Sequence, residues 1–130
     1  MYGDGWDSFE GNHGRLDYAL QEDTQRRAWV TVSWDHFQYD SYFSDRVPIS
    51  LMSGVPHVTN YHPGYEEVFG SDSPLMWAHS VEELIAKVER MLAAGPTELI
   101  ELGRAAQVYA SAHLTARPVY ERLLAEAMGA

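Results

Sequence analysis

The chain has 130 residues, 45% of them hydrophobic, a composition typical of one globular domain with a single core. Its net charge of −10 argues against sequence-independent binding of nucleic acid or of an anionic membrane surface, since both need clustered Lys and Arg. No cysteine is present and no apolar run approaches the roughly 20 residues that span a bilayer, so we expect a cytoplasmic protein without disulfides or a membrane span.

The first part of the chain predicts two extended segments separated by a helix. The opening letters MYGDGW place an apolar pair before Gly-Asp-Gly, which indicates a strand end followed by a turn. Residues 17–27 are polar with a few spaced apolar side chains, and we expect a weakly amphipathic surface helix there. Residues 29–34 alternate strictly and are rich in Trp, Val and Thr, which predicts a strand. Residues 35–44 show no periodicity and are expected to form a loop at its carboxyl end.

The middle of the chain continues the alternation of helices and strands. Residues 46–53 predict a short helix that ends at a Gly-Val-Pro turn. A short buried strand is expected at residues 57–59 and a further one at residues 75–78. Between them, residues 64–69 begin a helix with two acids in its first turn, where the helix dipole favours negative charge.

The last third of the chain predicts three helices. Ser80 and Glu83 form a capping-box pattern, and Thr97 is expected to cap the next helix, which would run to about His113. Thr115 would open the last helix. Helical spacing predicts core-facing positions in the first and last of these helices, namely Val81, Leu84, Ile85, Val88, Met91, Leu92, Val119, Leu123, Leu124 and Met128.

This order of elements predicts an α/β fold. We expect a three-layer, Rossmann-like parallel sheet of about four short strands with a helical C-terminal third. The chain would form one domain over residues 1–130, with an α/β part at residues 1–79 and the helices at residues 80–130. In such sheets ligands bind at the carboxyl edge, and phosphates favour loops where backbone N–H groups converge.

Several motifs, in this order and spacing, resemble those of one enzyme class. The chain from residue 29 onward is similar to the C-terminal, donor-binding lobe of GT-B glycosyltransferases, nearest to the spore-maturation-protein-like branch. The matching elements are Asp45-Arg46, Gly54-Val55-Pro56, His57-Val58-Thr59, Pro63-Gly64-Tyr65-Glu66-Glu67, Ser80-Val81-Glu82-Glu83-Leu84 and His113-Leu114-Thr115-Ala116-Arg117. The opening MYGDGW also resembles the strand-to-loop element that precedes the donor site in such lobes.

The resemblance implies that the lobe binds a nucleotide-diphosphate sugar and takes part in glycosyl transfer without a metal or another cofactor. The loop of His62, Pro63, Gly64 and Tyr65 would lie against the diphosphate, and a glycine there lets a backbone approach a ligand closely. An ordinary turn into a helix is the plainer interpretation of the same residues.

The resemblance places Glu67 near hydroxyls of the sugar or ribose, and Glu66 belongs to the same expected donor site. Adjacent helical residues point about 100° apart, so Glu66 and Glu67 cannot act together on one bond as an acid/base pair. Stabilisation of their own helix is the alternative role, above all for Glu66.

Arg46 is the expected charged contact to the diphosphate, because a guanidinium fork suits phosphate oxygens and can neutralise a departing diphosphate. The alternative is a surface ion pair with Asp40, Asp45 or a nearby glutamate. Possible sugar or base contacts are Trp34, His36, Asp45 and Tyr61, from a region rich in aromatic side chains on which sugars and bases can stack.

The six histidines do not predict a metal site. None has the i, i+4 spacing of a helical metal-binding pair, and no cysteine could join them. His57 follows a proline in a predicted strand and is expected to be a hydrogen-bonded core or edge residue.

One departure from the GT-B pattern bears on activity. Many GT-B enzymes carry two glutamates before the Gly-x-Pro turn. The second position corresponds to Ile49 here and the first falls near Ser41, although Asp40 or Asp45 could substitute after a one-residue shift. A GT-B enzyme also has an acceptor lobe, so we expect an N-terminally truncated lobe with negligible transfer activity alone. A separate N-terminal lobe could complete it, or the chain could self-associate through an exposed sheet edge. The alternative function is a non-catalytic nucleotide-sugar-binding or protein-interaction module.

Overall fold

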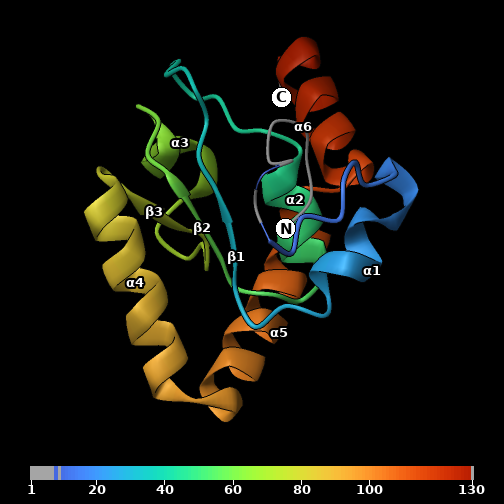
Figure 1. Ribbon diagram of the computed structural model, residues 1–130. Coiled ribbons are helices and arrows are strands. Elements are labelled where there is room, and N and C mark those ends of the chain that lie inside the picture. The colour runs from blue at the N-terminus through green and yellow to red at the C-terminus, as the bar shows by residue number, and fades with distance from the viewer. Residues whose placement is uncertain (1–7, 9, 130) are drawn as a thin grey trace.

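The computed structural model describes residue 8 and residues 10–129 and has an α/β fold built on a parallel sheet (Figure 1). The strands are β1 (Thr31–Ser33), β2 (His57–Asn60) and β3 (Met76–Ala78), in spatial order β1-β2-β3. Val58 of β2 pairs with Val32 on one side and Met76 on the other. The described residues therefore contain three of the about four expected strands, and the strand end predicted in MYGDGW lies outside them.

The helices complete the expected α/β order. They are the 3₁₀ helix η1 (Tyr18–Leu20), α1 (Gln21–Gln25), α2 (Arg46–Met52), α3 (Tyr65–Phe69), α4 (Val81–Ala94), α5 (Pro96–His113) and α6 (Ala116–Met128). Figure 1 shows the sheet between α4 on one side and α2 on the other, with α5 crossing below it. The C-terminal part is helical from α4 onward, as expected.

Two hydrophobic clusters hold these layers together. On the α4 face of the sheet, Val58 packs with Met91 and Leu99. On the α2 face, Val47 and Leu51 pack with Tyr65 and with small residues of α5. Every residue of β2 is buried, as expected for the central strand of a parallel sheet covered on both faces.

Helix α5 can approach the turn after α2 because Gly103 has no side chain. A Cβ at Gly103 would overlap the carbonyl oxygen of Gly54 and lie 2.9 Å from its carbonyl carbon. The turn itself needs Gly54, whose φ of +72° lies in the left-handed region. This close contact fixes α2, and with it Arg46, relative to α5.

A chain of buried polar side chains joins β1 to β2. The His57 ring lies between two hydroxyls, with Nδ1 2.9 Å from Thr31 Oγ1 and Nε2 3.0 Å from Ser33 Oγ. Ser33 in turn donates to Thr59 Oγ1 at 3.1 Å. Burial, with a smaller effect of the Arg46 charge, lowers the pKa of His57 from 6.5 to about 4. The prediction of a hydrogen-bonded core histidine is confirmed.

Several local expectations were met only in part. The segment at residues 17–27 divides into η1 and the five-residue α1, and α5 begins at Pro96, before Thr97. Proline suits the first turn of a helix because its missing N–H would have had no helical partner there. In the capping pattern of α4, Ser80 accepts from the Glu83 N–H, but the Glu83 side chain accepts from the His79 N–H rather than that of Ser80.

Apolar patterns in α4 and α6 were only partly matched by burial. Met91 is buried and Leu84 and Val88 pack against its cluster, whereas Val81, Ile85 and Leu92 are about half exposed. In α6 no residue is buried, and the expected inward positions Val119, Leu123, Leu124 and Met128 are 42–80% exposed. Among the described helices and strands, α6 packs mainly against α5. None of its residues is buried, so its apolar face does not form part of the core.

Candidate functional site

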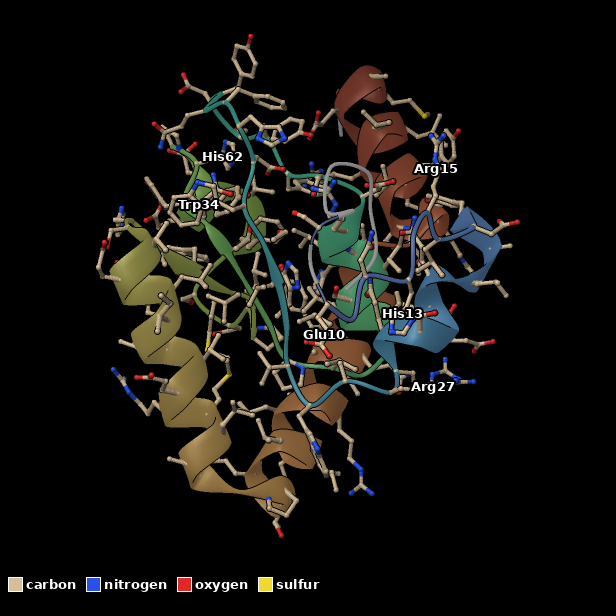
Figure 2. All side chains as sticks on the ribbon, in the orientation of Figure 1. Glu10, His13, Arg15, Arg27, Trp34 and His62 are labelled. Carbon is tan, nitrogen blue, oxygen red and sulfur yellow. The ribbon has the colours of Figure 1, made fainter. Side chains whose placement is uncertain are left out.

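A cavity of about 280 Å³ lies at the carboxyl edge of the sheet, and we call it the edge cavity. Its lining comes from the ends of all three described strands: Trp34, Asp35, His36, Phe37, Gln38, Asn60, Tyr61, Ala78 and His79. The structure thus brings together three of the expected sugar or base contacts, Trp34, His36 and Tyr61. Figure 2 labels Trp34 and His62, which both lie toward this end of the sheet.

Several residues that line the edge cavity are aromatic. The Tyr61 ring lies 4.5 Å from that of His79 between centroids, and Phe37 packs on Tyr39 at 5.3 Å. Trp34 is 41% exposed, so part of its indole is open to solvent. Such faces suit stacking on sugar or base rings.

Asp35 is a site residue that the sequence analysis missed. Its backbone N–H donates to Asn60 Oδ1 at 2.8 Å, and its side chain is only 6% exposed. Arg46 Nη1 lies 3.7 Å from its Oδ1, and His62 Nε2 lies 3.4 Å from its Oδ2. An available signal was its position directly after the predicted strand at residues 29–34, at the edge where open α/β sheets bind ligands.

His62 is wholly buried and fastens the loop after β1 onto β2. Its Nδ1 lies 3.2 Å from both the N–H and the carbonyl oxygen of Tyr39, and its Nε2 lies 3.1 Å from Asn60 Nδ2. Tyr42 covers the ring, with centroids 5.3 Å apart. The buried imidazole therefore holds the loop after β1 in place through its contacts with the Tyr39 backbone.

Tyr65 is also in the interior, with its ring among those of Tyr61, Phe69 and Trp77. Burial, and then the negative charge of Asp35, raise the pKa of its phenol. Its backbone N–H donates to the His62 carbonyl at 3.3 Å. Any contact of Tyr65 with a ligand would have to come from its backbone.

Gly64 allows the loop after β2 to touch the loop after β1. Its φ is +89°, and a Cβ there would lie 2.7 Å from Ser41 Oγ. The Ser41 N–H also donates to the Pro63 carbonyl at 2.6 Å. The space next to Gly64 is thus occupied by the chain itself, and the two loops that border the edge cavity are held together.

Arg46 stands in the first turn of α2 with its side chain 58% exposed. Its ion-pair partner is Asp35, not Asp40, Asp45 or a glutamate as the alternative held. At 3.7 Å this pair is longer than a hydrogen bond, and much of the guanidinium is open to solvent. The geometry leaves Arg46 able to meet an anion beside the edge cavity.

The remaining expected site residues lie around this edge at different places. Glu66 accepts a hydrogen bond from the Tyr61 hydroxyl at 3.2 Å, so it is linked to the wall of the edge cavity. Glu67 lines a separate cavity of about 510 Å³ between α3, α5 and α6. Asp45 is exposed, and Ile49 lines an apolar hollow beside Tyr18.

Within the described part of the chain, no group of three or more His, Asp or Glu residues is placed to hold a metal ion. Among the same residues no helix is long and apolar enough to cross a membrane.

Comparison with known proteins gives one match. A family model described as glycosyl transferase-like matches residues 1–125, which is nearly the whole chain. Neither the search of curated proteins nor that of solved structures found a match.

Proposed function

Because the chain belongs to the glycosyl transferase-like family, we propose that it binds a nucleotide-diphosphate sugar as the donor of a glycosyl transfer. The observation that carries this proposal is the edge cavity, which has aromatic residues in its lining and an exposed arginine paired with one of its lining residues, Asp35. The carboxyl edge of a parallel sheet is where α/β proteins of this kind bind nucleotides.

In this proposal Arg46 contacts the diphosphate. Its guanidinium is exposed and only loosely paired with Asp35, so it can turn a donor fork toward phosphate oxygens. When the glycosidic bond to the diphosphate breaks, negative charge grows on the leaving group, and a cation in contact with it lowers the barrier without a metal ion. The backbone of Pro63, Gly64 and Tyr65 would border the same group.

The sugar or ribose ring would enter the edge cavity and stack on aromatic faces. Trp34 and Tyr61 supply such faces, and His36 and His79 supply polar groups at the rim. The acceptor, and the base that deprotonates it, would come from a separate lobe. We therefore expect binding, and negligible transfer, from this chain alone.

The test is calorimetric titration of the chain with UDP, GDP and their glucose and mannose conjugates. We expect at least one of these to bind, and Arg46→Ala to weaken that binding tenfold or more, because a charge-assisted contact is lost. Arg104→Ala removes the same charge from the exposed face of α5 and should leave affinity unchanged. Absence of binding at millimolar ligand, or equal binding by Arg46→Ala, would refute the proposal.

A second candidate function, a protein-interaction module, is favoured by the exposed edge of the sheet. Among the described strands β1 pairs with β2 alone, and Val32 on β1 is 53% exposed. An open edge of this kind can accept a strand from another chain. Light scattering over a concentration series would detect self-association, and a Val32→Lys variant should abolish it if β1 is the contact. A monomer at all concentrations would remove self-association from consideration.

A further inference from the structure

Asp35 carries a buried carboxylate whose hydrogen bonds are incomplete. Its side chain is 6% exposed, and Oδ2 has no hydrogen-bond partner among the described residues. Buried carboxylates ordinarily accept several hydrogen bonds, because leaving a charged group without them carries a large desolvation penalty. Asp35 is also one of the residues that line the edge cavity.

His62 is the nearest candidate donor, but it does not complete the carboxylate. Its Nε2 lies 3.4 Å from Oδ2 and makes no hydrogen bond with it. The Asp35 N–H donates to Asn60 Oδ1, and Asn60 Nδ2 lies 3.1 Å from the same His62 Nε2. Oδ2 is therefore left without a hydrogen bond from either side chain.

The other two neighbours do not complete the carboxylate either. Arg46 lies 3.7 Å from Oδ1, beyond hydrogen-bond distance, and is more than half exposed. The Tyr65 hydroxyl is buried, and it too has no hydrogen-bond partner among the described residues. Asp35 therefore retains acceptor capacity that the surrounding side chains do not use.

The edge cavity matches a ligand that would supply the missing donors. Its volume of about 280 Å³ is near the lower end of the roughly 300–1,000 Å³ found for small-molecule sites, which suits one ring rather than a whole nucleotide sugar. Trp34, Phe37 and Tyr61 are aromatic residues of its lining, and Asp35 is the acid there. A ring that combines a stackable face with several O–H donors is a sugar ring.

We propose that Asp35 is a binding residue for the donor, and that its carboxylate accepts hydrogen bonds from hydroxyl groups of one sugar ring held in the edge cavity. The inference rests on the proposed function. The ring is either the ribose of the nucleotide or the hexose to be transferred, since both present vicinal hydroxyls. Charge-assisted hydrogen bonds of this kind make Asp35 a determinant of which hydroxylated ring is accepted.

The experiment measures affinities of three proteins for three ligands by calorimetry. The proteins are wild type, Asp35→Asn, and Asp72→Asn as a matched charge control on the exposed turn after α3. The ligands are UDP, 2′,3′-dideoxy-UDP and UDP-glucose, with the guanosine and mannose counterparts in their place if those bind better. Circular dichroism melting reports whether Asp35→Asn is folded.

If the ribose lies against Asp35, Asp35→Asn lowers the affinity for UDP at least tenfold. Wild type then binds the dideoxy analogue more weakly than UDP by a similar factor. If the hexose lies there, UDP is unaffected by Asp35→Asn and the tenfold loss appears with UDP-glucose. Asp72→Asn matches wild type in either case. Should Asp35→Asn fail to fold, the comparison of UDP, its dideoxy analogue and UDP-glucose on wild type still tests the inference, because equal affinities for all three ligands would show that neither set of ring hydroxyls is bound and would refute it.

Two results would overturn the inference and can be told apart. Equal affinities of wild type and Asp35→Asn for every ligand, with Arg46→Ala still impaired, would refute the role of Asp35 while the proposed function stands. Absence of any binding to wild type would refute both.

Discussion

Acidification from pH 7 to pH 5 should destabilise the wild-type chain through His57, and His57→Gln should remove that part of the loss. The His57 ring is buried between Thr31 and Ser33 in the hydrogen-bonded chain that joins β1 to β2. Burial, and to a smaller extent the Arg46 charge, lower its pKa from 6.5 to about 4. The folded protein therefore holds this imidazole neutral at pH values where an unfolded chain would protonate it.

The sign and size follow from proton linkage. The unfolded state binds the proton near pH 6.5 and the folded state only near pH 4. Protonation therefore stabilises the unfolded state relative to the folded state as the pH falls through this window, and the free energy of unfolding decreases. The two pKa values differ by about 2.5, and each pKa unit corresponds to about 1.4 kcal/mol, so the full effect is roughly 3 kcal/mol. At pH 5 this effect should lower the free energy of unfolding by about 2 kcal/mol, and above pH 7 it should lower it by almost nothing.

Urea unfolding at pH 7 and at pH 5 measures this difference for wild type, His57→Gln and His36→Gln. Wild type should lose about 2 kcal/mol more than His57→Gln over this interval. His36 is exposed, so His36→Gln should lose as much as wild type. Equal losses in wild type and His57→Gln would refute the reasoning, because they would show that His57 ionises alike in both states.

Two glycine substitutions test the packing that positions the edge cavity. Gly103→Ala should lower the free energy of unfolding by about 1–3 kcal/mol although alanine is the better helix former, because its Cβ would push on the Gly54 backbone. Arg104→Ala, on the same helix, is the control. A higher midpoint of thermal unfolding for Gly103→Ala than for this control would contradict the prediction and show that the Gly54 turn can move aside. Gly64→Ala should cost about 1–2 kcal/mol in urea unfolding, because its φ of +89° is unfavourable for a residue with a side chain. Most of that loss should persist when Ser41→Ala removes the hydroxyl that the new Cβ would touch, because the backbone conformation remains unfavourable. No loss of stability in Gly64→Ala would contradict the described turn.

The order of helices and strands could be predicted because local patterns and the core agree. Strict alternation at residues 29–34 marked β1, and the glycine-proline turns on either side of β2 marked its limits. The observed strands are nevertheless short, since β1 is paired over Thr31–Ser33 only. Helical periodicity could not show whether a partner exists for each apolar face, and so α6 was expected to be buried.

The candidate site could be predicted in outline only. Trp34, His36 and Tyr61 were expected at the carboxyl edge and line the edge cavity there. The burial of His62 and Tyr65 depends on how the loop after β1 folds over β2, which the local sequence does not encode. Asp35 was missed for the same reason, because its burial arises from contacts with residues 25 or so positions away.

The central claim is that a nucleotide sugar binds at the carboxyl edge of the sheet, and amide chemical-shift mapping tests it most directly. The ¹⁵N-labelled chain would be titrated with UDP-glucose and with GDP-mannose. We predict saturable shifts centred on residues 34–38, 60–64 and 78–79, with α4 and α6 unchanged along most of their length. Saturable shifts confined to α6 or the apolar hollow beside Ile49, or no shifts at millimolar ligand, would contradict the account.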